Sequence, residues 1–595
     1  MSGWAGMIRF DGAPLDRALF DAMTESLRFR GPDRTGTWIG ERAAFAHTLL
    51  ATTPEGVDER QPVVKRDVVF TGDLRIDARP VTTLTDPELA LDAYLEEGDA
   101  FVERLIGDFS FAVWDDRRRR LLLVRDRFAR RALFVARHEG ALLVTNNLPT
   151  LLAVPRLADA LDERAVADFL LFGRNYAARR TTFAAIARDP AAHRMIVTAD
   201  RTELQRYWTI PQRDQPRRIK PADAYAEFRD VFSLAVADRA RAGRIVISLS
   251  GGLDSNAVAA TLMQLRARGQ VRGEVTALTT VWNEVIKDTE GHYASIAAKA
   301  YGIPIEFHVA DACEPFEGWS DPRVRGWEPT DEPCTLPFFE FVRRAAAHAR
   351  VVLTGEGGDP VLYASHDHFF RLLKRLRWVQ FVREAAGYAL TRRRRPPLNV
   401  RSQLQLAFGH TPGLPPFVSW IAPELEQRLR LRERWAEVLA PGGPRRHPYR
   451  HDAWRVLDSP SWSRQFEASD AGTSGQPLEW LSPYLDRRVV ELLFSFPPMP
   501  YFANKDLVRE AMSGWIPDTV RLRPKTALPR DPSAIAFARA PQRWLDVVEK
   551  TPALDRFVDR RVLCLALKNG GASDYHYSQQ AFAVSLALWM TRSQE

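Results

Sequence analysis

The segment SLSGGLDS, residues 248–255, combines two adjacent glycines with three serines and one carboxylate, directly after the apolar run RIVI. Gly251 and Gly252 let backbone N–H groups approach a ligand closely, because neither residue carries a Cβ. A helix that begins near Asp254 or Ser255 would direct its free N–H groups and the positive end of its dipole at the same point. We therefore predict a phosphate-binding turn; the alternative is a plain glycine turn with a helix cap.

Carboxylates near this turn are the next requirement, because Mg²⁺ is bound by one or two carboxylates together with phosphate oxygens and water. Asp254 is the first candidate. The second is Asp359 in LTGEGGDP, where an apolar run again leads into a glycine-rich turn. Ligands of an open parallel sheet bind beyond the carboxyl ends of its strands. The two turns therefore predict a shared magnesium site.

Two further side chains suit acyl and phosphoryl transfer. Glu356, in the second turn, is placed to face the acceptor, although a loop carboxylate that caps a helix is the alternative. Lys505, in YFANKDLVREAM, offers a cation where negative charge develops at phosphorus and at a tetrahedral carbon. By itself this lysine is typical of a solvated helix. In combination with the two turns, these residues predict an enzyme site that handles a phosphate-bearing ligand.

A parallel sheet must position these residues. From residue 222 onward, apolar runs alternate with helical patterns, as in RIVISLS, NAVAATLMQLRARG, EVTALTTVW and GHYASIAAKAYG. This alternation predicts a doubly wound α/β sheet. From about Asp367 the pattern is mostly helical, with proline breaks at RRPPLN, GLPPF and APGGPRRHP. We therefore predict an α/β domain over residues 222–595 with a helical C-terminal part.

The first two hundred residues have a different pattern. Short apolar runs such as DVVFTGDL, GDFSFAVWD and RLLLVRD are separated by polar or glycine-containing turns, which predicts stacked antiparallel sheets. A helical pattern, DPELALDAYLEEGDAFVERLIG, interrupts them. Residues 206–221 are rich in proline and charge and predict a linker. Residues 1–205 then form the first domain.

Composition limits the remaining functions. The chain has 595 residues, of which 45% are hydrophobic and 27% charged, as in a multidomain globular protein. It has no apolar run long enough to cross a bilayer and no secretory signal at its start. Cys313, Cys334 and Cys564 lack metal-type spacing. We therefore predict reduced thiols and a cytoplasmic protein that does not act at a membrane.

Positive charge is the other compositional signal. The formal net charge is +8, with arginine clusters at residues 117–120 and 392–395. A solvated basic surface is the simpler interpretation, and an acidic or phosphorylated partner is the alternative. Because no zinc-finger spacing or RNA-binding signature is present, we predict no nucleic-acid partner.

The pattern S-G-G-x-D-S resembles the pyrophosphate loop of N-type ATP pyrophosphatases, which cleave ATP between its α and β phosphates. The chain as a whole resembles the asparagine synthetase B superfamily. FRGPDRTG, AFAH, GDFSFAVWD and LLLVRDRFARRALF are similar to the glutaminase domain of that family, and SLSGGLDS, LTGEGGD, SPYLDRR and ANKDLVREAM to its synthetase domain. The resemblance implies an α/β fold: an N-terminal, degenerate Ntn-hydrolase-like αββα sandwich and a C-terminal sheet like that of adenine-nucleotide α-hydrolases.

Departures from the family pattern concern the glutamine site. Glutamine-dependent members begin Met-Cys-Gly, with the cysteine as nucleophile, whereas residue 2 here is Ser2. A terminal serine could act with its own amine as base. However, Leu49 replaces the arginine that holds the glutamine carboxylate, and Thr71-Gly72-Asp73 replaces N-G-E, which removes the oxyanion-binding asparagine. The three losses together predict that the domain no longer hydrolyses glutamine, so the amine must already belong to a substrate.

β-Lactam synthetases and lasso peptide cyclases resemble this arrangement, and the segments after the pyrophosphate loop are most similar to those of lasso cyclases. The resemblance implies ATP and Mg²⁺ as cofactors and a short core peptide as substrate. An Asp or Glu side chain of the peptide is adenylated, and the N-terminal amine of the peptide then closes an isopeptide macrolactam. A leader peptidase and a leader-binding protein of the same pathway are implied as partners.

The resemblance also assigns roles to residues of the two turns and to Lys505. Lys505 stabilises developing charge, Glu356 accepts the amine proton, and Asp254 and Asp359 hold Mg²⁺. ATP and pyrophosphate are assigned to Leu249, Ser250, Gly251, Gly252, Leu253, Asp254, Ser255, Thr354 and Gly355. Thr279 and Thr280 are placed near the adenine by position alone, at the end of the strand after the pyrophosphate loop.

Two alternatives remain open. The first is an ammonia-dependent asparagine synthetase or another amide-forming member of the superfamily. It is weakened because the second turn continues as GGDPVL (357–362) and not as the G-S-D-E-x-F of asparagine synthetases. The second is a non-catalytic paralogue whose N-terminal domain serves as a binding module. The presence of Asp254, Asp359 and Lys505 argues against it.

Overall fold

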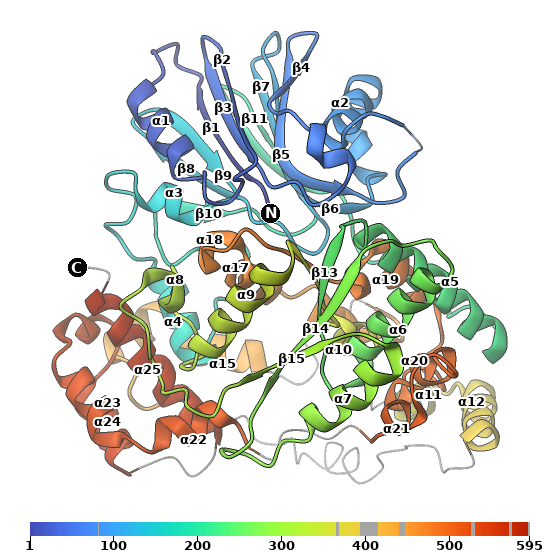
Figure 1. Ribbon diagram of the computed structural model, residues 1–595. Helices are drawn as coiled ribbons and strands as arrows, with labels where there is room; N and C mark the ends of the chain where they lie inside the picture. Colours follow the sequence, from blue (N-terminus) through green and yellow to red (C-terminus); the bar gives the residue numbers. More distant parts are fainter. Residues whose placement is uncertain are drawn as a thin grey trace.

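The computed structural model describes residues 1–80, 82–363, 368–392, 415–439, 447–524, 530–569 and 574–592. The ribbon shows a β sandwich, at the top of Figure 1, seated on a larger half built from a parallel sheet and many helices. The break RRPPLN, most of APGGPRRHP and the arginines 393–395 lie outside the described residues.

Two six-stranded antiparallel sheets form the N-terminal half, in the orders β10-β8-β9-β1-β3-β2 and β12-β11-β7-β6-β5-β4. The strands are β1 (Gly3–Arg9), β2 (Arg34–Ile39), β3 (Ala43–Leu49), β4 (Val63–Lys65), β5 (Val68–Ile76), β6 (Gly107–Asp115), β7 (Arg120–Arg125), β8 (Phe134–His138), β9 (Ala141–Thr145), β10 (Ile186–Arg188), β11 (His193–Val197) and β12 (Thr202–Arg206). Inward-facing side chains such as Trp4, Phe45 and Trp114 fill the space between the sheets. The predicted stack of antiparallel sheets is confirmed.

Helices cover the outer faces of the sandwich. On the second sheet lies α2 (Asp86–Glu97), whose Leu91 belongs to the same buried cluster as Phe111. One helix was expected over residues 86–107, but Gly98 adopts a φ of 60° and ends α2 before a short 3-10 segment. On the first sheet, α1 (Arg17–Glu25) shares its core with α25 (Asp574–Arg592) from the far end of the chain. The two halves therefore share a hydrophobic core.

The segment between the halves packs against the core of the second half. β12 ends at Arg206 and α5 begins at Pro221, and the described residues 207–220 form no helix or strand. Ile210 is buried in the core of the second half, and Trp208 packs against it. This stretch, predicted as a linker, is consequently not a free tether.

Five parallel strands form the sheet of the second half, in the order β15-β14-β13-β16-β17. They are β13 (Arg244–Ser248), β14 (Glu274–Val281), β15 (Ile305–Val309), β16 (Val351–Leu353) and β17 (Glu479–Leu481). Ile245 and Ile247 face one core and Val246 faces another, so the central strand is buried on both sides. The predicted parallel sheet is confirmed, with β17 as a strand that the sequence did not reveal.

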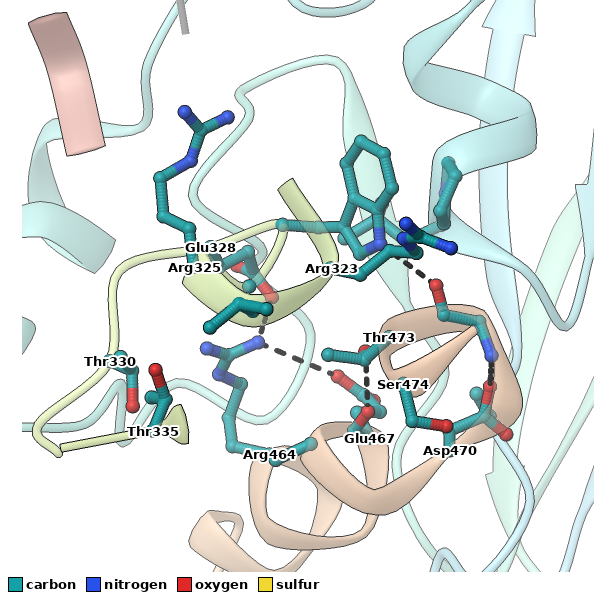
Figure 2. Close-up of a pocket in the computed structure, with 18 of the residues that line it drawn as sticks. Arg323, Arg325, Glu328, Thr330, Thr335, Arg464, Glu467, Asp470, Thr473 and Ser474 are labelled. Atoms are coloured by element: carbon teal, nitrogen blue, oxygen red, sulfur yellow. Dashed lines mark hydrogen bonds and ion pairs between the residues drawn. The ribbon is translucent and has the colours of Figure 1, made fainter. Parts of the chain in front are cut away.

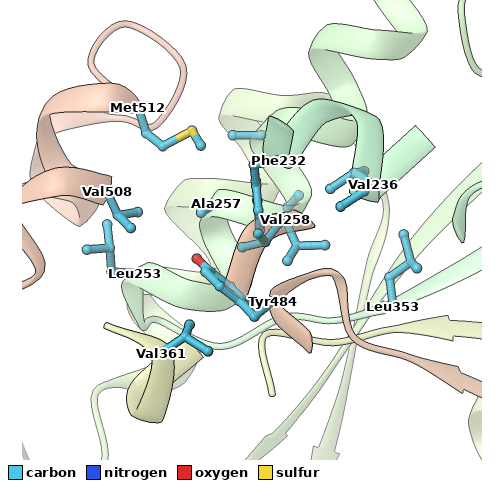
Figure 3. Close-up of a cluster of buried hydrophobic side chains, with 14 of the residues drawn as sticks. Phe232, Val236, Leu253, Ala257, Val258, Leu353, Val361, Tyr484, Val508 and Met512 are labelled. Carbon is cyan, nitrogen blue, oxygen red and sulfur yellow. The ribbon is translucent and has the colours of Figure 1, made fainter. Parts of the chain in front are cut away.

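Helices pack on both faces of this sheet. On one side lie α5 (Pro221–Arg239), α6 (Leu253–Ala267) and α20 (Asp506–Ala511), and on the other α9 (Leu336–His348). Figure 3 shows Phe232, Val258 and Tyr484 of the first core packed together. This core holds the N-terminus of α6 and thereby fixes the glycine-rich turn that precedes it.

The rest of the second half is mainly helical, as predicted. The other described helices of this half are α7 (Glu290–Tyr301), α8 (Pro322–Arg325), α10 (Gly358–Val361), α11 (His368–Lys374), α12 (Trp378–Arg392), α14 (Pro423–Leu429), α15 (Leu431–Leu439), α16 (His451–Leu457), α17 (Ser461–Ser469), α18 (Ala471–Ser474), α19 (Arg487–Ser495), α21 (Asp518–Arg521), α22 (Pro532–Ala538), α23 (Pro541–Glu549) and α24 (Arg560–Asn569). The N-terminal half adds α3 (Leu148–Leu152) and α4 (Glu163–Phe172). Of the helices that the structure describes, none combines the length and the apolar character that crossing a bilayer would need.

Candidate active site

The glycine-rich turn lies at the carboxyl end of β13, and α6 follows it with Gly252 as N-cap. Short-range hydrogen bonds hold the turn: Gly252 N donates to Ser250 Oγ at 3.1 Å, and Ser250 N donates to Ser255 Oγ at 3.0 Å. Thr279 Oγ1 donates to the Leu249 carbonyl at 2.6 Å. Thr279, which was expected beside the adenine, supports the turn through this bond and also lines an adjoining cavity.

Position 251 requires glycine because neighbouring side chains lie where a Cβ would be. A Cβ at this position would lie 2.5 Å from Arg523 Nη1 and 2.8 Å from Tyr293 Cβ. Arg523 Nη1 donates to the Gly251 carbonyl at 3.1 Å and to Glu290 Oε1 at 3.1 Å, while Gly251 N donates to Glu290 Oε2 at 2.7 Å. Glu290 and Arg523 thus clamp the turn. Sequence reasoning missed both, because each resembles an ordinary surface charge until the fold brings them together.

Lys505 joins the two predicted metal-binding carboxylates. Its Nζ lies 2.5 Å from Asp254 Oδ2 and 2.5 Å from Asp359 Oδ1. Asn504 and Lys505 both adopt left-handed backbone conformations, with φ of 53° and 57°. Such conformations cost about 1–3 kcal/mol for a residue with a Cβ and cluster at functional sites. The fold therefore places the lysine between the two carboxylates at an energetic cost.

The carboxylate pair, which Lys505 bridges in this structure, has the ligand chemistry that Mg²⁺ prefers. A Cβ on Gly358 would lie 2.7 Å from Asp254 Cγ, so the two glycine-rich turns approach as closely as glycine allows. Mg²⁺ needs only one or two protein carboxylates when phosphate oxygens complete its shell. Across the described ranges, no group of three or more His, Cys, Asp or Glu residues is arranged to hold a metal. Asp254 and Asp359 would therefore hold Mg²⁺ jointly with a phosphate ligand.

Three cavities meet at Ser250. The phosphate cavity, about 870 Å³, is lined by Gly251, Gly252, Leu253, Asp254, Asp359, Lys505, Arg509 and Arg523. The nucleoside cavity, about 560 Å³, is lined by Leu249, Thr279, Thr280, Trp282, Phe338 and Trp480. The acceptor cavity, about 740 Å³, is lined by Asp254, Ser255, Thr354, Gly355, Glu356, Gln465 and Trp480. We name each cavity for the chemistry that its lining suits.

The predicted nucleotide contacts divide between these cavities. Leu249 and Thr280 line the nucleoside cavity, and Leu253 lines the phosphate cavity. Thr354 and Gly355, which were expected to touch ATP, line the acceptor cavity beside Glu356. Gly355 is also a packing glycine, because a Cβ there would lie 2.6 Å from Ser255 N. The first residues of the second turn therefore face the acceptor cavity, whereas Asp359 faces the phosphate cavity.

Both oxygens of the Glu356 carboxylate are hydrogen-bonded. Gln465 Nε2 donates to Oε1 at 2.7 Å, and Arg130 Nη1 donates to Oε2 at 3.3 Å. The Glu356 side chain does not cap α10, whose N-cap is Gly357 without a side-chain hydrogen bond. The carboxylate is therefore oriented in the wall of the acceptor cavity.

A second charged cluster surrounds Ser2, Leu49 and Asp73, the positions at which residues of the family's glutamine site are replaced. Ser2 Oγ accepts a hydrogen bond from Leu50 N at 3.0 Å, and Ser2 N donates to Asp73 Oδ1 at 3.2 Å. Arg131 pairs with Glu479 of β17 and lies 3.6 Å from Asp73. The cavity that remains has a volume of about 30 Å³, roughly the space of two waters. A glutamine molecule does not fit there.

Glu479 links the two halves through this cluster. Burial by itself would raise the pKa of the Glu479 carboxyl, but Arg131 and other cations outweigh it and lower that pKa to about 2. For Asp73 the balance is reversed, since burial raises the pKa of its carboxyl despite Arg131. A carboxylate from the parallel sheet thus neutralises a buried arginine of the sandwich.

A smaller cavity of about 100 Å³ lies between the halves and shares Arg464 with the acceptor cavity. Figure 2 shows Arg464 directed between Glu328 and Glu467. Arg464 Nη1 lies 2.5 Å from Glu328 Oε2, and Arg188 Nη2 lies 2.6 Å and 2.8 Å from Glu328 and Glu467. Because these charges neutralise one another, we interpret this cluster as structural.

Comparisons with known proteins agree with this architecture. Residues 1–208 match the model of the glutamine amidotransferase domain, and residues 227–591 match that of asparagine synthase. The chain is 23% identical to asparagine synthetase [glutamine-hydrolyzing] 3 of Bacillus subtilis, over 96% of this chain and 94% of that protein. It is 28% identical to a putative asparagine synthetase [glutamine-hydrolyzing] of Mycobacterium bovis, over 60% of this chain and 58% of that protein.

Among solved structures, the glutamine phosphoribosylpyrophosphate amidotransferase of B. subtilis in complex with ADP and GMP aligns with 60% of this chain and 77% of its own, at 12% identity and a TM-score of 0.25. The fold is an N-terminal sandwich of two antiparallel sheets with helices on its outer faces, joined to a C-terminal parallel sheet with helices on both faces. Because the synthase model covers more than half of its length, the chain belongs to the asparagine synthase family and is an ATP-dependent ligase that forms amide bonds.

Proposed function

We propose that this protein is a lasso peptide cyclase. It adenylates an Asp or Glu side chain of a leader-cleaved core peptide and closes an isopeptide macrolactam with the N-terminal amine of the same peptide. AMP and pyrophosphate are released. The observation that supports this proposal best is the contrast between the closed pocket behind Ser2, with about 30 Å³ of space, and the open acceptor cavity of about 740 Å³. The amine then comes from a source other than glutamine, and we assign it to the peptide substrate.

The first step is phosphoryl chemistry in the phosphate cavity. A carboxylate oxygen of the peptide attacks the α-phosphorus of ATP, the bond to the bridging oxygen breaks, and pyrophosphate leaves. Lys505 and Arg523 line this cavity and offset the charge that develops on the phosphate oxygens. Asp254 and Asp359 would hold Mg²⁺, which neutralises phosphate charge when it is bound.

The second step forms the amide. The peptide amine attacks the carbonyl carbon of the acyl adenylate, and the bond between that carbon and the AMP oxygen breaks. The amine must be neutral to attack, so a base has to take its proton. Glu356 lines the acceptor cavity and is the residue to which we assign that task. Threading of the tail through the ring is then a matter of holding the peptide in position.

The direct test is incubation of the protein with ATP, Mg²⁺ and a leader-cleaved candidate peptide. The expected products are AMP, pyrophosphate and a peptide lighter by one water. The precursor peptide would be encoded beside a leader-binding protein and a leader peptidase, which we propose as pathway partners.

An ammonia-dependent asparagine synthetase is the second candidate. The named relatives from B. subtilis and M. bovis favour asparagine synthesis, because both are called asparagine synthetases, although both names also specify glutamine hydrolysis. If the protein releases AMP with aspartate and free ammonia but releases none with the peptide as sole substrate, this candidate is favoured and the cyclase is excluded.

A further inference from the structure

The loop between β7 and β8 of the sandwich reaches into the active half. Within this loop the Asp126 carboxylate accepts hydrogen bonds from the backbone N–H groups of Phe128, Arg130 and Arg131, at 2.9, 3.0 and 2.9 Å. The residue before Arg130, Ala129, adopts a left-handed φ of 55°. The loop is therefore fixed in one conformation that projects consecutive arginines out of the sandwich.

Arg131 and Arg130 have different partners. Arg131 pairs with Glu479 in the closed pocket, as described above. Arg130 reaches two residues that line the acceptor cavity: its Nη1 lies 3.3 Å from Glu356 Oε2, and its Nη2 donates to the Trp480 carbonyl. Its guanidinium lies 4.0 Å from the centre of the Phe466 ring. With 4% of its side chain exposed, Arg130 has an ion pair, a backbone acceptor and a stacking partner.

These contacts define the position of the Glu356 carboxylate. Arg130 holds one oxygen and Gln465 the other, so the carboxylate has little freedom to rotate. A guanidinium suits this task better than an ammonium, because its planar fork bonds two acceptors while its face stacks on a ring. The backbone of Glu356 is also fixed, since its N–H donates to Thr354 Oγ1 at 3.1 Å.

We infer that Arg130 of the N-terminal sandwich is a positioning residue for Glu356, so that the degenerate domain forms part of the amine-accepting site. The inference rests on the proposed role of Glu356 as proton acceptor. It gives the sandwich a task in catalysis that does not depend on glutamine. The alternative is that Arg130 only joins the two halves.

The two interpretations differ in which step they affect. A positioning residue for the base matters when the amine loses its proton, and not when the carboxylate attacks ATP. A purely structural arginine matters for both steps alike. Hydroxylamine gives a second way to distinguish the two interpretations. It is largely neutral near neutral pH, so it captures an acyl adenylate without help from a base.

The experiment compares Arg130→Leu, Arg130→Lys and a matched control, Arg127→Leu. Arg127 belongs to the same loop and is equally buried, but it donates to the carbonyls of Val102, Glu103 and Leu105 inside the sandwich. Three rates are measured for each full-length protein: peptide-dependent exchange of pyrophosphate into ATP, macrolactam formation, and hydroxamate formation with added hydroxylamine.

For Arg130→Leu we expect macrolactam formation to fall by about 10²-fold, the usual cost of a misplaced reacting group. Pyrophosphate exchange and hydroxamate formation should stay near the wild-type rates, and Arg130→Lys should recover part of the loss. Equal loss of all three rates in Arg130→Leu, as in any destabilised protein, would overturn the inference. So would unchanged macrolactam formation.

Failure of the proposed function would be visible separately. In that case the wild-type protein shows no peptide-dependent exchange but forms asparagine from aspartate and ammonia. The same comparison of adenylation with amide formation, run on aspartate, then decides the role of Arg130. Selective loss of the amide-forming step supports it, and parallel loss of both steps refutes it.

Discussion

Two charged clusters, one between the halves and one in the active half, use the same kind of ion pair in opposite ways. In the closed pocket, Arg131 and Glu479 have 3% and 4% of their side chains exposed, and almost no space adjoins them. In the active half, Asp254, Lys505 and Asp359 border a cavity of about 870 Å³, and 62% of the Asp359 side chain is exposed. The comparison teaches that the space in front of a charge indicates a ligand site, whereas the pairing of charges alone does not.

Backbone geometry separates the two clusters as well. Lys505 and the residue before it, Asn504, both have left-handed backbone conformations, whereas Glu479 lies on a regular strand. A conformation that costs energy is retained where a side chain has to meet a substrate. A cluster that only joins two halves has no need of it.

The strongest test of this contrast is removal of a charge from the open cluster. Lys505→Ala and Asp254→Asn should each lower the rate of AMP formation by about 10²–10³-fold, because each removes a group that stabilises or neutralises phosphate charge. The rate is measured with saturating ATP and peptide. Lys299→Ala, on the exposed part of α7, is the control and should leave the rate unchanged. A fully active Lys505→Ala protein would refute the role of this lysine.

Removal of a charge from the closed cluster should affect stability instead. Glu479→Gln leaves Arg131 buried without its closest carboxylate, which typically costs about 3–5 kcal/mol. We expect a clearly lower thermal midpoint. Glu433→Gln, at an exposed pair on α15, is the matched control. If the two variants unfold at the same temperature, the closed cluster does not join the halves as described.

The same carboxylate predicts a pH dependence. The folded-state pKa of Glu479 is about 2, below its ordinary value of 4.5, so its stabilising effect is complete above pH 4.5. It should be lost as pH falls from 4.5 toward 2, by about 3 kcal/mol in total. The difference in thermal midpoint between wild type and Glu479→Gln should therefore shrink over this range. A difference that does not change with pH would contradict the assignment.

The smallest expected effect concerns residue 2, where serine replaces the nucleophilic cysteine of glutamine-dependent members. Ser2→Cys alone should release no ammonia from glutamine, because Leu49 and Asp73 remain and the pocket keeps a volume of only about 30 Å³. Ammonia is measured with and without ATP and peptide. Release of ammonia above the level of the wild-type protein would show that the pocket opens.

Local motifs made part of the site predictable from sequence. The turn at 248–255 was recognisable because a buried strand, two glycines and a helix start follow one another directly. The second turn repeated that order and gave Asp359 and Glu356. Lys505 needed the family resemblance, since nothing in its neighbours reveals the distance to Asp254.

The remaining features depend on contacts between distant segments. Arg130, Glu290, Gln465 and Arg523 acquire their roles only when the fold brings them to the turns, and β17 is a three-residue strand that gives no pattern of its own. The core that α25 shares with the sandwich joins residues more than five hundred positions apart. Periodicity along the chain carries no information about such partners.

The most direct test of the central claim is to determine which molecule supplies the nitrogen of the new amide bond. The protein is incubated with ATP, Mg²⁺ and the core peptide in the presence of glutamine whose side-chain amide carries heavy nitrogen. The account predicts AMP release and a peptide lighter by one water that contains no heavy nitrogen. Heavy nitrogen in the product would show that the pocket behind Ser2 still supplies ammonia, and would contradict the account.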